Sequence, residues 1–107
     1  MEGAPKISVI IPCYNQGAYL DEAVQSVLAQ TFQGFEILIV DDGSTDEATV
    51  RLLTDCTWPK TRVIRTENQG LAAARNNGIQ EARGAYILPL DADDRIGPDY
   101  LAEAARI

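Results

Sequence analysis

Three aspartates, Asp91, Asp93 and Asp94, fall within four consecutive positions near the C-terminal end of the sequence. Carboxylates this close repel one another unless a cation neutralises them, and their hard oxygens favour Mg²⁺ or Mn²⁺. In an extended backbone the side chains alternate, so Asp91 and Asp93 would point to the same side. The other interpretation is a solvated acidic turn that caps the following helix, and the cluster alone does not separate the two.

A second pair of carboxylates, Asp41 and Asp42, directly follows an apolar run in the first half of the chain. A carboxylate at such a place could accept a hydrogen bond from the N–H of a base or from a ribose hydroxyl. The ring of Tyr14, which follows another apolar run, could stack on a base. The competing interpretation makes Asp41, Ser44 and Asp46 turn and cap residues, and Tyr14 a half-buried aromatic residue at a strand end.

Arg75 is the third candidate, and it follows the Asn68-Gln69-Gly70 turn. Its guanidinium could bind phosphate oxygens, or it could pair with Glu81 or Asp46 at the surface. Gly70 has no Cβ, so a ligand could approach its backbone closely, or the glycine could serve the turn alone. These side chains would form one site only if the fold brings them together.

The composition excludes several classes of protein. The chain has 107 residues, of which 46% are hydrophobic, and a net charge of −7, which indicates one acidic folded domain rather than a nucleic-acid-binding protein. It contains no histidine, so it has no histidine-based catalytic triad. It also lacks a Gly-Xaa-Gly-Xaa-Xaa-Gly after the first apolar run and a Walker A loop, which argues against an ordinary dinucleotide site and a P-loop enzyme.

The cysteines and the apolar runs bear on the location of the protein. Cys13 and Cys56 match no zinc or redox spacing, so we expect two reduced thiols. The segment 1–6 has no apolar signal core, and no apolar run approaches the roughly 20 residues of a membrane span. We therefore expect a cytoplasmic protein, with the cytoplasmic face of the membrane as the alternative for a longer form.

Hydrophobic periodicity predicts that strands and helices alternate. Short β-branched runs predict strands. Apolar residues at helical spacing predict helices, with Leu20, Val24 and Val27 on the core face of one and Leu71, Ala74 and Ile79 on that of another. Ser44 and Glu47 match a capping box, and Pro98 suits the first position of a helix. The strands are expected at 7–11, 36–40, 62–65 and 85–90, and the helices at 18–28, 44–54, 71–84 and from Pro98 onward.

This alternation predicts a Rossmann-like α/β fold with a mostly parallel sheet. The near-continuous apolar strands indicate that helices cover both faces of the sheet. Pro12 is expected to stop the first strand, and Pro89 to lie near a strand end or on an unpaired side. Ligands of such sheets bind beyond the carboxyl ends of the strands, which selects 12–15, 41–46 and 91–94.

Four motifs follow one another at these places. They are Ser8-Val9-Ile10-Ile11-Pro12-Cys13-Tyr14-Asn15, Val40-Asp41-Asp42-Gly43-Ser44-Thr45-Asp46, Asn68-Gln69-Gly70 with Ala74-Arg75-Asn76-Asn77-Gly78, and Leu90-Asp91-Ala92-Asp93-Asp94. Together they closely resemble the motifs of the family 2 glycosyltransferases, which have the GT-A fold. The resemblance covers residues 6–107, and it implies the nucleotide-sugar-binding half of such an enzyme.

The resemblance implies a site for a nucleotide-sugar donor, usually a UDP-sugar. The segment 12–14 and Asp42 would hold the base, and Asp91 would lie near the ribose. Asp93, with Asp91 of the same Asp-Xaa-Asp (DXD) motif, would ligate the Mn²⁺ or Mg²⁺ that bridges the diphosphate. The donor-contacting residues that we expect are Pro12, Tyr14, Asn15, Asp41, Asp42, Gly70, Arg75, Asp91 and Ala92.

The chain departs from the family in length, because the family's catalytic domains are considerably longer. We expect residues 1–107 to be a single, truncated domain that binds donor weakly and transfers no sugar. The general base is expected beyond Ile107, together with the site for the acceptor, which is a saccharide, a lipid or a protein in the family. The apolar surface against which the missing half would pack is expected to favour homodimers.

Two other functions stay open on the residues alone. One is a non-catalytic module that binds a nucleotide or a metal. The other is a magnesium-binding receiver domain of a signalling protein, which also gathers acidic residues at strand ends. A receiver domain needs a lysine after a late strand, and Lys6 and Lys60, the only lysines, follow no suitable strand.

Overall fold

The computed structural model describes residues 4–106, and residues 1–3 and Ile107 lie outside this range. The expectation that the segment 1–6 has no apolar signal core therefore concerns residues that lie partly outside this range. The strands are β1 (Ile7–Cys13), β2 (Phe35–Asp42), β3 (Thr61–Thr66) and β4 (Tyr86–Pro89). The helices are α1 (Gly17–Leu28), α2 (Glu47–Asp55), α3 (Leu71–Glu81) and α4 (Tyr100–Ala104).

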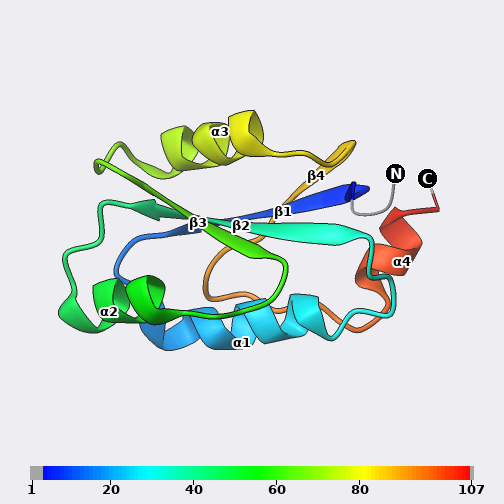
Figure 1. Cartoon of the computed structure of the whole chain (residues 1–107), viewed down its shortest axis with the longest axis horizontal. Coiled ribbons are helices and arrows are strands. Elements are labelled where there is room, and N and C mark those ends of the chain that lie inside the picture. The colour runs from blue at the N-terminus through cyan, green and yellow to red at the C-terminus, as the bar shows by residue number, and fades with distance from the viewer. Residues whose placement is uncertain (1–3, 107) are drawn as a thin grey trace.

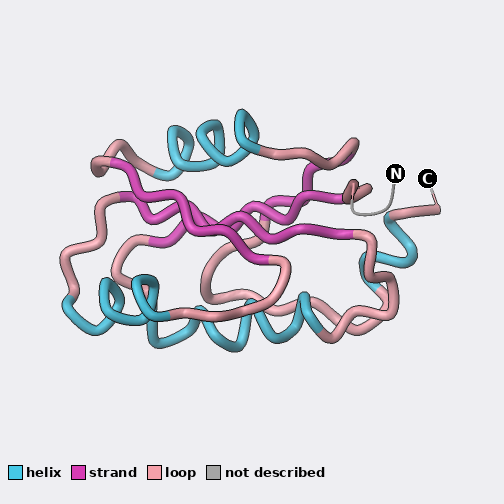
Figure 2. Tube along the Cα trace, viewed as in Figure 1, coloured by secondary structure: helices cyan, strands magenta, loops and turns pink. Residues whose placement is uncertain are grey.

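The four strands form one parallel sheet in the order β3-β2-β1-β4, which confirms the predicted alternating α/β fold. Helix α3 covers one face, and α1 and α2 cover the other (Figure 1). The short α4 lies beyond the amino end of the sheet, as the tube trace also shows (Figure 2). All four strands therefore point their carboxyl ends toward the same edge, at the left of both views.

The two faces of the sheet differ in the depth of their cores. Odd-numbered residues of β1, such as Val9 and Ile11, belong to the large core beneath α1. Ile10 belongs to a smaller cluster with Leu38, Val40 and Ala74 under α3. This second core is thin because α3 comes very close to the strands: a Cβ added at Gly78 would lie 2.5 Å from Ile10 Cγ2.

The predicted helical stripes were correct for α1 and only partly so for α3. Leu20, Ala23, Val24 and Val27 are fully buried, as their spacing predicted. In α3 the expected core positions Leu71 and Ile79 are 52% and 46% exposed. A helix that packs through small residues, here Ala74 and Gly78, turns a narrow face to the sheet and leaves its larger apolar side chains outside.

The two strand prolines lie where they cost no ladder hydrogen bond. Leu90 N donates to Ile10 O, so the even-numbered residues of β1 point their backbone N–H and C=O groups toward β4. Ile10 is the last residue of β1 that pairs with β4, so Pro12, which lacks an N–H, lies beyond that ladder. The expectation that Pro12 stops the strand was wrong for this reason, because β1 continues to Cys13. Pro89 faces away from β1, on the open edge of the sheet, as predicted.

Two helix starts differ from the prediction. Asp46, not Ser44, caps α2, and its carboxylate accepts the Thr49 amide at 3.0 Å. Helix α4 begins at Tyr100 rather than at Pro98, because the Pro98 carbonyl accepts the Thr31 amide at 2.9 Å and holds this residue in the preceding turn.

A buried polar cluster joins the amino ends of β1 and β2 to the connection between α3 and β4. Ser8 Oγ donates to Glu36 Oε2 at 2.5 Å, and the Arg83 amide donates to the same oxygen at 2.6 Å. The Gly84 amide donates to Ser8 Oγ at 2.8 Å. Burial on its own raises the pKa of Glu36, but the hydrogen bonds from Ser8, Arg83 and Arg62 outweigh burial and bring this pKa below its ordinary value of 4.5. The Glu36 side chain is therefore held as a carboxylate.

Two further expectations concern the thiols and the membrane. Cys13 and Cys56 are both free thiols, as predicted. Within residues 4–106, none of the helices has the length and apolar character needed to cross a bilayer.

Candidate functional site

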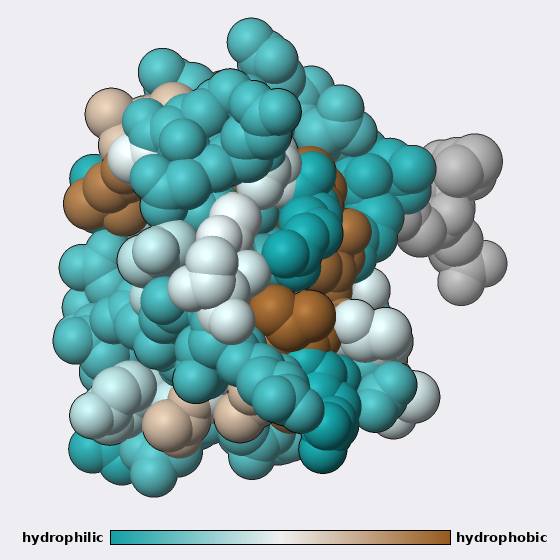
Figure 3. Space-filling view, turned by 90° about the vertical axis from the view of Figure 1, so that its left-hand side faces the viewer, coloured by the Kyte–Doolittle hydropathy of each residue, from teal (hydrophilic) through white to brown (hydrophobic). Residues whose placement is uncertain are grey.

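The loops that follow the four strands meet at the carboxyl edge of the sheet. This edge presents a mostly hydrophilic surface with a small hydrophobic area near its centre (Figure 3). The segments selected from the sequence, 12–15, 41–46 and 91–94, all lie at this edge, because they end β1 and β2 or follow β4. The fourth loop, 67–70, connects β3 to the start of α3.

A hollow of about 270 Å³ opens between the ends of β1 and β2 and the first turn of α3. Tyr14 borders it and is 44% exposed, so part of its side chain is open to a ligand. Burial raises the pKa of the Cys13 thiol, which therefore contributes a neutral group. The residues that line the hollow are Pro12, Cys13, Tyr14, Gln16, Asp42, Leu71 and Ala74.

Asp42 contributes its carboxylate to this hollow and also holds the neighbouring loop. Its two oxygens accept the amides of Gln69 at 2.8 Å and Gly70 at 3.0 Å. The side-chain amide of Asn68 donates to the Asp42 carbonyl at 3.1 Å. A carboxylate has about four acceptor positions, so these two amides do not use all of them, and the exposed 5% of Asp42 borders the hollow. Gly70 caps α3 with φ of 95°, a conformation that favours glycine, and its role in the turn is therefore accounted for.

Asp41 lies on the opposite face of β2 and does not reach the hollow. It is 1% exposed, and its oxygens accept the Ser44 amide at 2.9 Å and Arg65 Nη1 at 2.7 Å. The expected contact of Asp41 with the donor is therefore not supported by the geometry, since both oxygens brace the β2–α2 loop. Arg65 was not among the residues expected from the sequence. The parallel pairing of β2 with β3 places it beside Asp41, with its side chain on the same face of the sheet.

Asn15 ties two of the loops together. Its backbone has φ of 54°, which asparagine tolerates better than most residues. Its side-chain oxygen accepts the backbone amides of Thr45 and Asp46, each at 2.8 Å. The backbone amide of Asn15 donates to Ser44 Oγ at 3.0 Å. Asn15 was expected among the donor-contacting residues, and in this structure its side chain binds the loop between β2 and α2.

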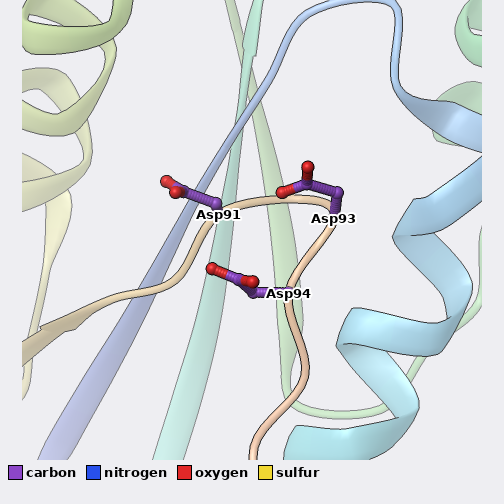
Figure 4. Close-up of side chains that lie close together, drawn as sticks. All are labelled: Asp91, Asp93 and Asp94. Atoms are coloured by element: carbon purple, nitrogen blue, oxygen red, sulfur yellow. The ribbon is translucent and has the colours of Figure 1, made fainter.

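The acidic cluster lies on the turn after β4. Asp91, Asp93 and Asp94 are exposed, and one carboxylate oxygen of each lies within 4.8 Å of the others. The carboxylates of Asp93 and Asp94 are directed toward Asp91 (Figure 4). Leu90 and Ala92 are buried in the large core, but the backbone here is not the extended one from which we expected Asp91 and Asp93 to share a side. It forms a turn in which the Asp94 amide donates to the Asp91 carbonyl at 3.0 Å. The Ala92 side chain is 1% exposed, so the donor contact expected of Ala92 would have to come from its backbone.

The donor set of this turn fits a divalent metal. One oxygen of each carboxylate lies within 4.8 Å of the others, so the turn supplies three hard oxygen ligands side by side. Their exposure leaves room for water and phosphate oxygens, which Mg²⁺ keeps in its coordination sphere. Asp93 and Asp91, the two metal ligands expected from the sequence, both belong to the cluster.

Arg75 joins the cluster from α3. Its Nη2 lies 3.1 Å from Asp91 Oδ1, so its partner is neither Glu81 nor Asp46, the two alternatives considered from the sequence. Arg75 and Asp91 border a second hollow of about 380 Å³, also lined by Leu88, Pro89, Leu90, Asp94, Arg95, Ile96 and Tyr100. Ala74 lines the first hollow and Arg75 the second, so both hollows border α3.

This arrangement defines a class of protein. An aromatic-bordered hollow at the carboxyl edge of a parallel α/β sheet is the kind of place where such folds bind nucleotides. Solved structures of similar fold are GT-A glycosyltransferases. The sequence model described as glycosyl transferase family 2 matches residues 8–106, and the chain belongs to this family.

Three similar proteins illustrate the relationship. An uncharacterized glycosyltransferase of Rickettsia felis is 52% identical over 97 residues, which are 90% of this chain and 16% of that protein. The structure of S. aureus TarS 1-349 in complex with UDP-GlcNAc matches at 33% identity with a TM-score of 0.83, over 94% of this chain and 30% of that one. Mannosyltransferase PcManGT from Pyrobaculum calidifontis, in complex with GDP-Man and Mn²⁺, matches at 29% identity with a TM-score of 0.82, over 98% of this chain and 32% of that one. The chain thus spans a third or less of each.

Proposed function

We propose that this chain binds a nucleoside diphosphate sugar, together with a divalent metal, as the donor-binding part of a glycosyltransferase. The observation that carries the proposal is a pair of hollows that both border α3, one lined by Tyr14 and Asp42 and the other by residues of the acidic turn. A base in the first hollow and a diphosphate near the second would use both. The complexes of TarS with UDP-GlcNAc and of PcManGT with GDP-Man and Mn²⁺ support this class of ligand.

The base site is proposed to take uracil. Tyr14 offers a ring face, and Asp42 retains acceptor positions for the N–H of a base. GDP is the second candidate, because PcManGT is described with GDP-Man. The ribose would lie toward Asp91, between the two hollows.

The metal is proposed to be Mn²⁺ or Mg²⁺, held by Asp93 and Asp91. When bound, it would supply Lewis-acid stabilisation of the negative charge on the leaving diphosphate. The chain's own contribution is to fix the carboxylates on a turn anchored in the core by Leu90 and Ala92. Arg75 is proposed to add a cation on the donor's phosphate side.

Sugar transfer needs groups besides these. An acceptor hydroxyl must approach the anomeric carbon, with a base within hydrogen-bond reach of it. We propose that the base and the site for the acceptor, a saccharide, a lipid or a protein, lie in parts of the longer relatives that this chain does not match. A cytoplasmic location, where nucleotide sugars would be met, is part of the same proposal.

Calorimetric titration of the chain with UDP, GDP and ADP, each with Mn²⁺ and with EDTA, tests the proposal. We expect UDP to bind in the presence of Mn²⁺, more tightly than GDP or ADP, and to lose most of its affinity in EDTA. A receiver-type domain would bind Mg²⁺ and show no response to UDP. A chain that binds none of the three nucleotides with Mn²⁺ would contradict the donor-binding function.

A further inference from the structure

Arg75 is the cationic partner of the acidic turn. Within residues 4–106, the ion pair between Arg75 Nη2 and Asp91 Oδ1, at 3.1 Å, is the one contact of a basic side chain with Asp91, Asp93 or Asp94. The nearby Arg95 pairs instead with Glu22, at 3.3 Å. The cluster thus holds three carboxylates and one neutralising guanidinium.

The guanidinium of Arg75 is only partly used by this pair. Its Nε atom is buried and has no hydrogen-bond partner, although a guanidinium presents five N–H donors. The side chain as a whole is 39% exposed, so N–H donors of the guanidinium that the pair with Asp91 leaves free can bind an anion with several oxygens. The buried Nε would gain a partner only if the side chain moved, and a buried donor without a partner is costly. Arg75 borders the hollow that also holds the acidic turn, where such an anion would lie.

A divalent metal at this turn would compete with Arg75 for Asp91. Two cations on one carboxylate repel each other at these distances, and no other anion among the described residues contacts Arg75. A diphosphate that enters with the metal supplies the missing negative charge. The cation on α3 would then oppose the metal before the nucleotide binds and favour the complex afterwards.

We propose that Arg75 is an exchangeable counter-ion: it holds Asp91 when no metal is bound and passes from Asp91 to the donor's diphosphate when metal and nucleotide bind together. This rests on the proposed function and adds a coupling between its two ligands. By linkage, the nucleotide raises the metal affinity by the same factor by which the metal raises the nucleotide affinity, and Arg75 sets much of that factor.

The test is calorimetric titration of Mn²⁺ into the nucleotide-free chain, and of UDP into the chain saturated with Mn²⁺. The variants are Arg75→Gln, Arg75→Lys and the control Arg95→Gln, which removes the same charge from the same hollow and from a residue next to Asp94. Melting temperatures show that each variant is folded.

We expect Arg75→Gln to tighten Mn²⁺ binding by about two- to fivefold in the absence of nucleotide, as removal of one exposed ion pair would give. The same variant should weaken UDP in the presence of Mn²⁺ by about tenfold, as the loss of a charge-assisted hydrogen bond would give. Arg75→Lys keeps the charge and should leave the Mn²⁺ affinity near that of the wild type, while weakening UDP. Arg95→Gln should change the Mn²⁺ affinity by less than Arg75→Gln does.

Equal effects of Arg75→Gln and Arg95→Gln on Mn²⁺ would overturn the exchange, because the effect would then be one of general charge. Weaker Mn²⁺ binding in Arg75→Gln would overturn it as well. Both results leave the wild-type chain as a metal-dependent nucleotide binder. A wild-type chain that binds no Mn²⁺ would instead remove the metal site itself, and the exchange with it.

Discussion

The carboxylate of Asp42 accepts the backbone amide of Gly70 at 3.0 Å across 28 residues of sequence. Together with the bond to Gln69, this contact fastens the turn before α3 to the end of β2. It gives one residue two roles, since the same carboxylate borders the Tyr14 hollow. The turn held by Asp42 leads directly into α3, and Arg75 of α3 pairs with Asp91 of the acidic turn.

The first prediction separates these two roles of Asp42. Asp42→Ala removes both the loop contacts and the base acceptor, and it should lower the free energy of unfolding by about 1–3 kcal/mol, because two amides lose their partner. Asp42→Asn keeps one acceptor and should lie between Ala and the wild type. Urea unfolding measures this, and UDP titration measures binding. An unfolding free energy unchanged in both variants would show that the loop contacts carry no stability.

The second prediction concerns Asp93. Asp93→Ala should abolish the dependence of UDP binding on Mn²⁺ and leave the melting temperature in EDTA unchanged or raised, because it relieves repulsion among exposed carboxylates. Asp55→Ala, which removes an exposed carboxylate on α2, is the control. Metal-dependent UDP binding that survives in Asp93→Ala would remove Asp93 from the metal site.

The third prediction concerns the ring of Tyr14. Tyr14→Ala should weaken UDP by about 1–3 kcal/mol if the base stacks on this ring, as aromatic platforms for bases do. Tyr19→Ala is a matched control, because Tyr19 is also exposed but lies on α1 and does not line the hollow. Calorimetry with UDP reads both. Comparable losses in the two variants would speak against stacking at Tyr14.

The fourth prediction concerns the closeness of α3 to the sheet. Gly78→Ala places a Cβ 2.5 Å from Ile10 Cγ2 and should lower stability by about 1–3 kcal/mol, more than the helix propensity of alanine returns. Asn76→Ala on the exposed side of α3 is the control and should not destabilise the chain. Thermal unfolding of both decides. A Gly78→Ala variant as stable as the wild type would mean that α3 can move away from β1 at no cost.

The fifth prediction concerns pH. Hydrogen bonds hold the pKa of Glu36 below 4.5, so its contribution to stability is present above the unfolded-state pKa and is lost as the pH falls through the lower folded-state pKa. The stability difference between the wild type and Glu36→Gln should therefore shrink as the pH is lowered below about 4.5. Ser8→Ala, which removes one of those hydrogen bonds, should show a weaker pH dependence than the wild type. Urea unfolding from pH 3 to pH 7 checks this, and a difference constant over that range would contradict it.

The sequence predicted the buried face of a helix well where large apolar residues recur at helical spacing. It predicted that face less well where the helix packs through small residues. The stripe of α1 was readable because its core face consists of Leu20, Ala23, Val24 and Val27. The face of α3 was not, because helix packing through Gly78 leaves larger apolar residues exposed. Periodicity alone gives the same weight to Leu71 and Ala74.

The site was predicted as a place more reliably than as a set of contacts. Adjacent residues of a strand face opposite sides, so Asp41 and Asp42 had to diverge, but the sequence does not tell which one meets the ligand. The fold resolves this: Val40 and Asp42 lie on the α3 side, and Ile39 and Asp41 on the other. The Arg75–Asp91 pair joins a helix to a turn 16 residues later, a contact that only the tertiary structure brings about.

Pro89 has a consequence for solubility. Strand β4 is an edge strand in the described part of the chain, and its even-numbered residues turn their backbone toward β1. Of the two residues that face outward, Ile87 and Pro89, only Ile87 carries an amide hydrogen. A strand of another molecule that adds to this edge finds one donor where a regular strand would offer two, which weakens the edge-to-edge pairing through which exposed sheets aggregate.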